Sequence, residues 1–570
     1  MTAMASVMTG AASGFEVTWH SIDWAKAHRQ VRRLQMRIAK AVRDKRWSKV
    51  KALQWLLTHS FSGKALAVKR VTENRGKRTP GVDGEIWDTP AKKAKAVMSL
   101  KRRGYQPRPL RRVFIPKANG KQRPLGVPTL FDRAQQALHL LALEPVAETT
   151  ADPNSYGFRP MRSCRDAVGQ CFIALSQKNS APWVLDADIS SCFDEISHSW
   201  LEAHIPMDRT ILRKWLTSGF VWKNRLFPTD EGTPQGGIIS PTLATMTLDG
   251  METMLHQHFG KKGSGKAAKN KVNLIKYADD FVVTGTTRNV LEEAKALIEA
   301  FLNKRGLSLS AEKTRIVHID DGFDFLGWTL RKYGGKLLIK PAKKNVQTHS
   351  RKVRATIKEM RTAKQEEVIA KLNPIIRGWA NYHQNQVAKE TFNKVDSLTW
   401  KRLWRWACRR HPSKSKTWIK NRYFLHVGTR SWVFGTKVKG DDGKVRFVKL
   451  VQASDTPIRR HTKIKGAANP FDPAWEPYFE KRLGLTMKES LGGKQRLLCL
   501  WRAQKGVCPN CHEPITKNTG WHIHHILPKV QGGTDNLTNL MLLHPNCHRQ
   551  IHNLERRELA APVKRGFAEA

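Results

Sequence analysis

The feature that most constrains this chain is a pair of adjacent acids held between two apolar runs. In NLIKYADDFVVTG (273–285), apolar residues flank the tetrapeptide YADD (277–280) on both sides. Two strand-like runs this close together predict a tight hairpin with Asp279 and Asp280 at its turn. Adjacent carboxylates repel each other unless a cation lies between them, so the pattern indicates a metal site. For an isolated YADD, the alternative is a hairpin turn that merely contains two acids.

A third acid completes a candidate catalytic set. The segment LDADISSCFD (185–194) begins with a short apolar strand that ends near Asp188. Alone, Asp188 would be interpreted as a helix N-cap or a surface acid. With Asp279 and Asp280 it supplies three carboxylates, the minimum for a two-metal phosphoryl-transfer site. Because Mg²⁺ prefers oxygen ligands and completes its shell with substrate phosphates, the three acids predict Mg²⁺ and a nucleoside triphosphate substrate.

The charge of the chain indicates its partner. Lys and Arg number 100 against 48 Asp and Glu, a net charge of +52 over 570 residues. A folded protein with this imbalance repels itself unless a polyanion neutralises it. The sequence has no apolar run of about 18 residues that could span a membrane, and its first residues do not form a secretory signal. We therefore expect a cytoplasmic protein that binds a long tract of nucleic acid and no membrane.

Length and composition predict several domains. Helical spacing of apolar residues marks 20–75 and three amphipathic helices within 345–410, while strand-like and helical runs alternate in an α+β pattern from 85 to about 330. The polar stretch 259–271 is expected to be a flexible insertion. Residues 411–470 carry 14 Lys and Arg against three Asp, which predicts a basic, loosely ordered module before a compact end domain that begins near 494.

One group of cysteines predicts a zinc site. Of eight cysteines, only Cys508, Cys511 and Cys547 cluster, a pattern typical of a reduced protein with a metal site rather than a disulfide scaffold. Thiolates suit Zn²⁺ in a closed tetrahedral site. His544 stands at the spacing that would supply the fourth ligand; alternatively it points elsewhere and the site is weaker.

Eight ordered blocks give the chain a family resemblance. They are TPGVDG (79–84), IPKANGKQRPLGVP (115–128), SYGFRP (155–160), LDADISSCFD (185–194), TPQGGIISP (233–241), YADD (277–280), GLSLSAEKT (306–314) and GFDFLGW (322–328). Their order and spacing resemble reverse transcriptases, specifically those encoded by group II introns, and most closely those of bacterial, cyanobacterial type. RGWANYH (377–383) resembles the thumb and maturase region of the same family, and 411–470 resembles its DNA-binding region.

The resemblance implies roles in a polymerase site. Asp188, Asp279 and Asp280 would bind the catalytic Mg²⁺ ions. Phe193 would be the aromatic gate that excludes a ribose 2′-hydroxyl; the alternative is a core aromatic. Roles in binding the incoming deoxynucleoside triphosphate fall to Lys117, Arg123, Gln235, Gly236 and Gly237. For Lys117 and Arg123 the alternative is a generic basic surface. The Trp-Arg run WKRLWRWACRR (400–410) predicts stacking on RNA bases or, equally, an ordinary amphipathic helix.

The C-terminal histidines resemble an HNH endonuclease. WHIHHILPKVQGGTDNLTNLMLLHPNCHRQIH (521–552) contains a His-His pair, an Asn and a His-x-x-x-His repeat. The resemblance implies a ββα-metal fold in which His525 is the general base and Asn539 orients its loop. His524, His548 and His552 would surround a divalent metal, taken to be Mg²⁺. Relatives commonly have cysteine where this chain has His544. The alternative is a structural zinc knuckle, which has no need of the His-His pair.

These observations predict a multidomain α+β protein with a right-hand reverse transcriptase. We expect fingers and palm at 1–330, a helical thumb or maturase region at 331–410, a basic DNA-binding region at 411–490 and the endonuclease at 491–570. The implied function is retrohoming: the protein binds its intron RNA, assists splicing, nicks target DNA and copies the intron by target-primed reverse transcription.

Two other classes remain open. One is an RNA-binding splicing factor with vestigial catalytic sites, which the intact acids and His525 disfavour. The other is a host-defence reverse transcriptase, which an HNH domain behind a maturase-like thumb disfavours.

Overall fold

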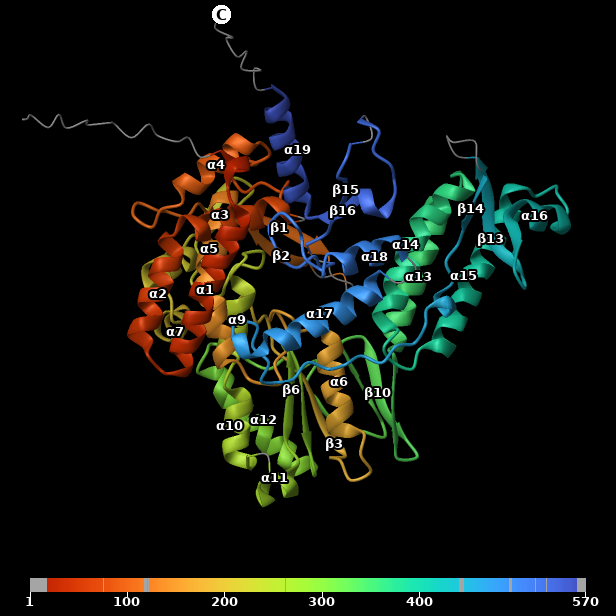
Figure 1. Ribbon diagram of the computed structural model, residues 1–570. Coiled ribbons are helices and arrows are strands. Elements are labelled where there is room, and N and C mark those ends of the chain that lie inside the picture. The colour runs from red at the N-terminus through yellow and green to blue at the C-terminus, as the bar shows by residue number, and fades with distance from the viewer. Residues whose placement is uncertain are drawn as a thin grey trace, which may run out of the picture. The chain divides into compact units, whose positions relative to one another are not determined.

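The structure is a computed structural model that describes residues 18–560 except 75, 117–119, 121, 262, 440–444, 492–494, 518 and 529–530, and except the side chains of 486, 488–490 and 554–560. The described residues form two compact units that alternate along the chain (Figure 1). Unit 1 lies within 1–151, 191–247 and 467–570, and unit 2 comprises 152–190 and 248–466.

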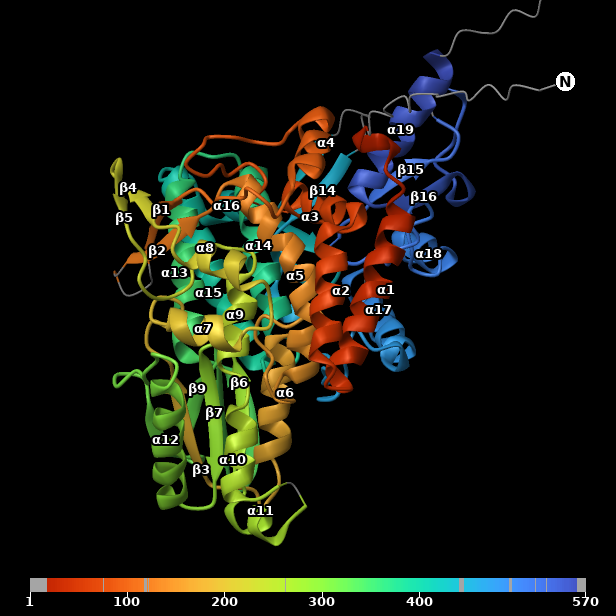
Figure 2. The same ribbon diagram turned by 90° about the vertical axis from the view of Figure 1, so that its left-hand side faces the viewer.

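A four-stranded antiparallel sheet is the centre of the part of unit 2 that the sequence predicts to be the palm. Its order is β6-β7-β3-β8, with β3 at Trp183–Asp188, β6 at Asn273–Tyr277, β7 at Asp280–Gly285 and β8 at Arg315–His318. The apolar residues on both sides of YADD are buried. Helices α6 (Cys164–Leu175), α10 (Met251–Phe259) and α12 (Arg288–Asn303) pack against the sheet (Figure 2). The α+β interpretation of this region is confirmed.

The polar stretch 259–271 differs from expectation, because it contains a short helix, α11 (Gly265–Asn270). The Ser264 side chain caps this helix by accepting a hydrogen bond from the Ala267 amide at 3.2 Å. A serine cap followed by two alanines outweighs the flanking glycines locally.

Three helices form the next part of unit 2, as the apolar spacing predicted. They are α13 (Lys343–Glu359), α14 (Gln365–His383) and α15 (Lys389–Arg410), and they follow a three-stranded sheet of β9 (Phe323–Phe325), β10 (Trp328–Tyr333) and β11 (Lys336–Pro341). Their shared core contains Val353 of α13, Leu372 of α14 and Leu403 of α15.

The described residues of the basic segment after α15 form regular secondary structure, so for them the expectation of a loosely ordered module is wrong. It contains α16 (Lys416–Tyr423) and an antiparallel sheet of β12 (Phe424–Val427), β13 (Arg430–Lys439) and β14 (Val445–Lys449), followed by the short helix η2 (Ala453–Asp455). Tyr423, Phe424 and Phe434 are buried in the same core as the thumb helices. A count of charges does not register the apolar residues that lie between the lysines. Burial of those residues stabilises the ordered structure.

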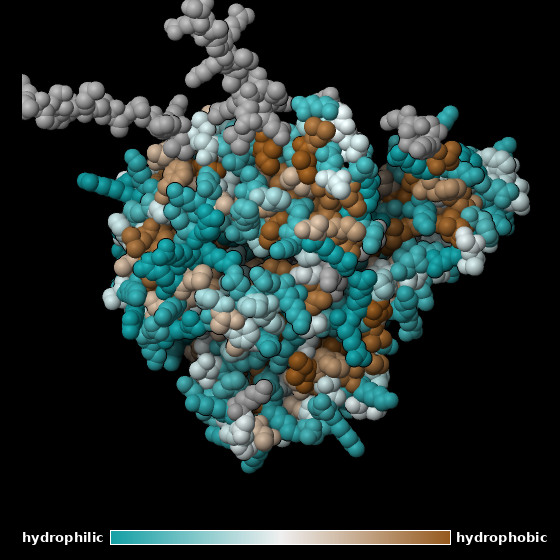
Figure 3. All heavy atoms as spheres, viewed as in Figure 1, coloured by the Kyte–Doolittle hydropathy of each residue, from teal (hydrophilic) through white to brown (hydrophobic). Residues whose placement is uncertain are grey.

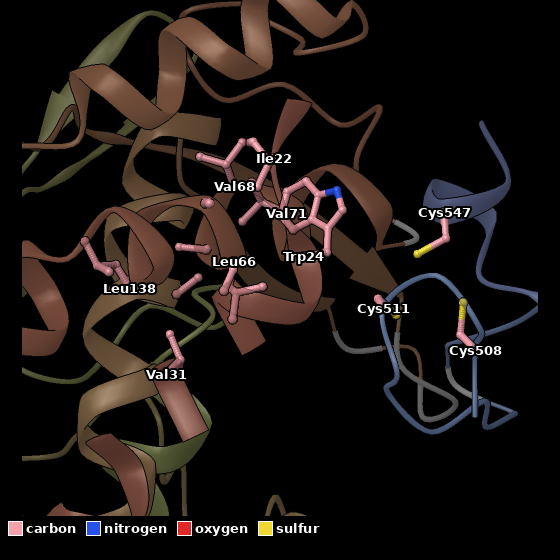
Figure 4. Close-up of a cluster of buried hydrophobic side chains, with 14 of the residues drawn as sticks. Ile22, Trp24, Val31, Leu66, Val68, Val71, Leu138, Cys508, Cys511 and Cys547 are labelled. Carbon is pink, nitrogen blue, oxygen red and sulfur yellow. The ribbon is translucent and has the colours of Figure 1, made fainter. Parts of the chain in front are cut away.

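Unit 1 begins with the helices expected at 20–75. They are η1 (Trp19–Ser21), α1 (Trp24–Arg43), α2 (Trp47–His59) and α3 (Phe61–Glu73), and α4 (Pro90–Ser99) and α5 (Leu130–Thr150) join them. Asp23 caps α1 by accepting from the Lys26 amide at 2.8 Å. Val31 of α1 and Val68 of α3 lie in one apolar core (Figure 4).

A second part of unit 1 carries a mixed sheet of order β2-β1-β4-β5. Its strands are β1 (Leu110–Pro116), β2 (Gln122–Val127), β4 (Phe220–Trp222) and β5 (Arg225–Phe227), and the helices α7 (His198–His204), α8 (Arg209–Leu216) and α9 (Ser240–Thr247) complete this part. β1 and β2 form an antiparallel hairpin, and β1 pairs with β4 in parallel.

The end domain of unit 1 has the expected ββα order. It contains η3 (Pro473–Trp475), α17 (Glu476–Ser490), α18 (Gln495–Ala503), β15 (His522–His525), η5 (Leu537–Asn539), β16 (Leu540–Leu543) and α19 (Pro545–Ala560). It packs on the N-terminal helices: the Trp19 indole donates to Asn546 at 3.2 Å, and the Gln550 amide donates to the His20 carbonyl at 2.9 Å. Cys508, Cys511 and Cys547 belong to the same apolar core as Trp24 (Figure 4).

Hydrophilic residues predominate on the face that Figure 3 shows. Among the described helices, none combines the length and the apolar composition that a membrane crossing needs.

Candidate functional sites

The palm sheet places two of the predicted carboxylates side by side on neighbouring strands. Asp188 ends β3 and pairs in register with Asp280, the first residue of β7, across 92 residues of chain. Asp279 lies in the turn just before Asp280, and its carbonyl accepts from the Ile189 amide at 3.1 Å. The end of β3 and the YADD turn therefore meet at one edge of the sheet.

The YADD turn is built with close backbone contacts. Ala278 has a φ of +59°, in the left-handed region. A Cβ on Gly157 would lie 2.2 Å from the Ala278 nitrogen, so only glycine fits there. The Tyr156 amide donates to the Lys276 carbonyl at 2.8 Å. The SYGFRP block thus lies beside the turn that carries the acids.

Four aspartate carboxylates repel one another at this edge of the sheet. Burial, followed by the carboxylates of Asp186, Asp188 and Asp279, raises the pKa of Asp280 to about 8. Burial likewise raises the pKa of Asp186 to about 6, against the opposing effect of its hydrogen bond from Arg315. Sequence reasoning missed Asp186, although it stands two residues before Asp188 and so shares its face of the strand.

A lysine from another block partly offsets this repulsion. Lys313, in GLSLSAEKT, makes an ion pair with Asp188. Among the described residues, the three predicted acids do not form a set whose ligand atoms all lie within 4.8 Å of one another. Mutually repelling, half-buried carboxylates that Lys313 and Arg315 only partly compensate nevertheless fit a divalent oxygen-seeking metal, because such an ion would remove the repulsion. Lys313 belongs to one of the eight blocks that carry the family resemblance, but the sequence alone indicated no role for it.

The predicted nucleotide-binding residues that the structure describes lie in unit 1. Arg123 is exposed on β2, opposite Ile115 of β1, and Lys117 lies outside the described residues. Gly236 has a φ of +123°, and a Cβ there would lie 2.7 Å from the Gly126 carbonyl oxygen. The Gln235 carbonyl accepts from the Gly126 amide at 2.8 Å. The TPQGG loop therefore lies directly on the β1–β2 hairpin.

Phe193 is half-buried beside the same loop. Its carbonyl accepts from the Thr233 amide at 2.6 Å, and the Gln235 side chain donates to Asp194 at 3.5 Å. These residues line a cavity of about 720 Å³ with aromatic walls that include Phe220 and Trp222. Phe193 borders this open space and is not a fully buried core aromatic.

The Trp-Arg run on α15 divides into two kinds of residue. Trp406 is buried, and its indole nitrogen donates to the Met360 carbonyl at 2.9 Å, so it is a core residue. Trp400 and Trp404 are half-buried and parallel, with ring centres 6.2 Å apart. The exposed Trp432 of β13 lies edge-on to both. The run is thus an amphipathic helix whose outer aromatic residues remain accessible.

The predicted zinc ligands come together as one buried group. The ligand atoms of Cys508, Cys511, His544 and Cys547 all lie within 4.8 Å of one another, and the three thiols face one space in Figure 4. His544 directs Nδ1 to the Cys511 sulfur at 3.2 Å, while its Nε2 lies 3.3 Å from the Pro514 carbonyl oxygen. A carbonyl that accepts from the outer nitrogen is the usual way to orient a ligating histidine. Three thiols and one imidazole fit Zn²⁺.

The thiols and the imidazole of this group shift one another's pKa in opposite directions. Hydrogen bonds from Cys511 and Cys547 lower the pKa of the Cys508 thiol. Burial lowers the pKa of His544, but hydrogen bonds to Cys508 and Cys547 outweigh burial and raise it to about 9. Hydrogen bonds to Cys508 and Cys547, together with burial, raise the pKa of the Cys511 thiol. Without a cation, the thiolate form is therefore favoured at Cys508 but not at Cys511, and a bound metal would favour the thiolate at both.

A second group of ligands consists of histidines alone. The ligand nitrogens of His524, His548 and His552 lie within 4.8 Å of one another, and Nε2 of His552 is 3.3 Å from Nε2 of His548. His524 extends from β15, and His548 and His552 lie one turn apart on α19. Imidazole ligands suit transition metals such as Zn²⁺ or Ni²⁺, whereas Mg²⁺ prefers oxygen, so the expected Mg²⁺ does not fit this donor set well.

His525 and Asn539 lie beside this group in a shared loop network. Nε2 of His525 is 2.8 Å from Oδ1 of Asp535, a partner that sequence reasoning missed. The Asn539 side chain accepts from the Leu527 amide at 2.7 Å and donates to the Thr534 carbonyl at 2.9 Å. Asn539 therefore joins the segment after His525 to the loop that carries Asp535. The only sequence signal for Asp535 was its place between the two expected residues.

Family models match most of the described chain in four stretches. Residues 19–100 match the N-terminal domain of reverse transcriptase, and 115–330 match reverse transcriptase (RNA-dependent DNA polymerase). Residues 346–424 match the group II intron maturase-specific domain, and 508–554 match HNH endonuclease.

Several individual proteins are similar to parts of this chain. Protein YkfC of Escherichia coli is 35% identical over 309 residues, which cover 47% of this chain and 79% of that protein. The group II intron-encoded protein LtrA of Lactococcus lactis is 29% identical over 331 residues, 47% of this chain and 54% of LtrA. A Candida albicans telomerase structure overlaps 57% of this chain and 65% of its own, with a TM-score of 0.30 and 13% identity.

The chain spans about half the length of LtrA and most of YkfC. The palm carboxylates, the two candidate metal-binding groups and the four consecutive family matches all lie in the order that the sequence blocks implied. The chain therefore belongs to the group II intron-encoded reverse transcriptases, and it joins reverse transcriptase, maturase and HNH endonuclease domains in one protein.

Proposed function

We propose that this protein copies its group II intron RNA into DNA at a target that it nicks itself, and that it assists splicing of that intron. In this assignment fingers and palm occupy 1–330, thumb and maturase region 331–410, DNA-binding region 411–490 and endonuclease 491–570. The observation that carries the polymerase part is the pairing of Asp188 with Asp280 at the edge where the YADD turn closes.

In the polymerase site, Asp188, Asp279 and Asp280 would hold Mg²⁺. When bound there, Mg²⁺ lowers the pKa of a primer 3′-hydroxyl and neutralises charge on the triphosphate. The three carboxylates that would hold the cation lie at the end of β3, at the start of β7 and in the turn before β7. Their repulsion makes a site without a cation unfavourable, which favours metal binding.

The substrate of this site is a deoxynucleoside triphosphate. The guanidinium of Arg123 offers a planar fork of donors for phosphate oxygens, and Lys117 adds a point charge. Phe193 would fill the space that a ribose 2′-hydroxyl needs. Gln235 and Gly236 would present backbone to the incoming nucleotide, and the glycine is the residue that permits close approach.

The endonuclease part rests on His525 and its neighbours. In hydrolysis of the phosphodiester, His525 takes a proton from the attacking water, the new bond to phosphorus forms and the bond to the 3′-oxygen breaks. That oxygen leaves and takes a proton from solvent, which yields the 3′-hydroxyl that primes DNA synthesis. A divalent transition metal held by His524, His548 and His552 would stabilise charge on the scissile phosphate.

The remaining partners follow from charge and family. Intron RNA and target DNA would bind the basic helices of the thumb and the β12–β14 sheet, where lysines and exposed aromatic residues alternate. Zn²⁺ at the Cys508 group would hold the endonuclease domain together. We place the protein in the bacterial cytoplasm.

Primer extension tests the polymerase proposal. The full-length protein, a primed RNA template, deoxynucleotides and Mg²⁺ should give full-length cDNA, and Asp279→Ala should abolish it. The exposed Asp321→Asn is the matched control and should extend normally. If wild type makes no cDNA but still binds its intron RNA tightly, the protein is an RNA-binding splicing factor and the polymerase proposal is rejected.

A further inference from the structure

We infer that Asp535 is a positioning residue for the endonuclease: it holds His525 in the tautomer and orientation that accepts a proton from the attacking water. The inference rests on the proposed endonuclease function and adds to it a residue that the family pattern did not assign. Its basis is a side chain contact, Nε2 of His525 to Oδ1 of Asp535 at 2.8 Å.

The contact fixes where the proton of the imidazole lies. A carboxylate at hydrogen-bond distance from Nε2 is an acceptor, so Nε2 carries the proton in the neutral ring. The lone pair then lies on Nδ1, which has no hydrogen-bond partner among the residues that the structure describes. Nδ1 is therefore the atom able to take a proton from water.

The loop that carries Asp535 is held in place from two sides. Asn539 donates to the Thr534 carbonyl at 2.9 Å and to the Leu527 carbonyl at 3.0 Å. The Arg496 guanidinium donates to the Asp535 carbonyl. The loop before Asn539 and the segment after His525 are thereby tied together, which keeps the carboxylate opposite the imidazole.

This arrangement gives Asn539 a physical role as well. The Ile526 amide donates to the Asn539 carbonyl at 2.9 Å, and the Leu527 amide donates to its side chain at 2.7 Å. Asn539 thus orients the backbone next to His525, while Asp535 orients the ring itself. Asn539 and Asp535 therefore constrain different parts of the proposed general base His525, its neighbouring backbone and its imidazole ring.

The pair contributes little to folding, which makes the inference testable. Asp535 is 60% exposed and His525 is 27% exposed. Pairs this accessible to solvent typically add about 0–1 kcal/mol of stability. We therefore expect substitution of Asp535 to leave the fold, the zinc content and primer extension unchanged.

The experiment measures single-strand nicking of a supercoiled plasmid by the full-length protein with its intron RNA and a divalent metal. The protein concentration is varied, so that the maximal rate and the half-saturating concentration are measured separately. Asp535→Asn keeps the size of the side chain but loses its charge, and should lower the maximal rate roughly 10- to 100-fold, as for partners that orient functional histidines. The half-saturating concentration should not change, and Asp535→Glu should restore part of the rate.

A double-mutant cycle identifies the residue through which Asp535 acts. In a His525→Ala background, Asp535→Asn should cause no further loss, because the ring that it orients is gone. The neighbouring Asn536→Ala, whose side chain is exposed and caps nothing, is the matched control and should nick at the wild-type rate.

Each outcome decides one question. If the wild-type protein fails to nick DNA with any of the metals tested, the proposed endonuclease function is rejected, independently of Asp535. If wild type nicks and Asp535→Asn nicks equally fast, the positioning role is rejected. Additive losses in the cycle, or a loss of zinc or of thermal stability in Asp535→Asn, likewise overturn it in favour of a separate or purely structural role.

Discussion

At the scale of single residues, the palm carboxyl of Asp280 links pH to stability. Its pKa of about 8 exceeds the ordinary value of 3.8, because burial and the neighbouring acids favour the neutral form. The folded protein without metal then binds more protons than the unfolded chain between these values, so its stability falls as pH rises from about 4 to about 8. Each tenfold change in proton affinity corresponds to about 1.4 kcal/mol.

Asp280→Asn removes this ionisation and should therefore stabilise the metal-free protein at pH 8 by at least about 1 kcal/mol, with little effect at pH 4. Urea unfolding of the palm, followed at both pH values in a chelator, measures the difference. The exposed Asp321→Asn should behave as wild type at both. Equal stabilisation at pH 4 and pH 8 would show that ionisation of Asp280 is not the cause.

At the scale of elements, the β12–β14 sheet and the thumb helices share one core. Phe434 of β13 is 3% exposed, and its ring centre lies 5.9 Å from that of Trp406 on α15. Phe434→Ala should cost about 3–5 kcal/mol, because it leaves a cavity between sheet and helices. The midpoint of urea unfolding measures this loss.

Phe447 of β14 is the matched control, since the same side chain is 61% exposed there. Phe447→Ala should change stability by about 0.5 kcal/mol or less. If the two alanine variants unfold alike, the sheet does not depend on packing against α15.

At the scale of the whole molecule, the Cys508 group belongs to the core that the end domain shares with the N-terminal helices. Removing Zn²⁺ should therefore loosen both, and structural zinc typically contributes on the order of 10 kcal/mol to a small domain. Cys511→Ser should lose one zinc per chain and lower the thermal midpoint, as measured by metal analysis and calorimetry. Cys499→Ser, outside the group, should retain both properties; equal midpoints for the two variants would contradict a structural role.

Local patterns in the sequence were sufficient for much of the fold and of the candidate sites. The hairpin around YADD, the helices at 20–75 and 345–410, and the two ligand pairs Cys508/Cys511 and His544/Cys547 each depend on residues close together in the chain. Periodicity of 2 or 3.6 and ligand spacing along a helix or loop are properties of a short segment, so they can be recognised without the rest of the chain.

The partners of those residues were decided only by the tertiary structure. Asp188 meets Asp280 through strand register, Lys313 reaches Asp188 from a distant loop, and Asp535 reaches His525 across a turn. The packing of Phe424 and Phe434 in the β12–β14 sheet likewise depends on a core contributed by helices that precede it. Sequence by itself determined which chemical groups the chain carries and the local elements that hold them. Which groups face each other depends on long-range pairing and packing, whose free energy no local pattern encodes.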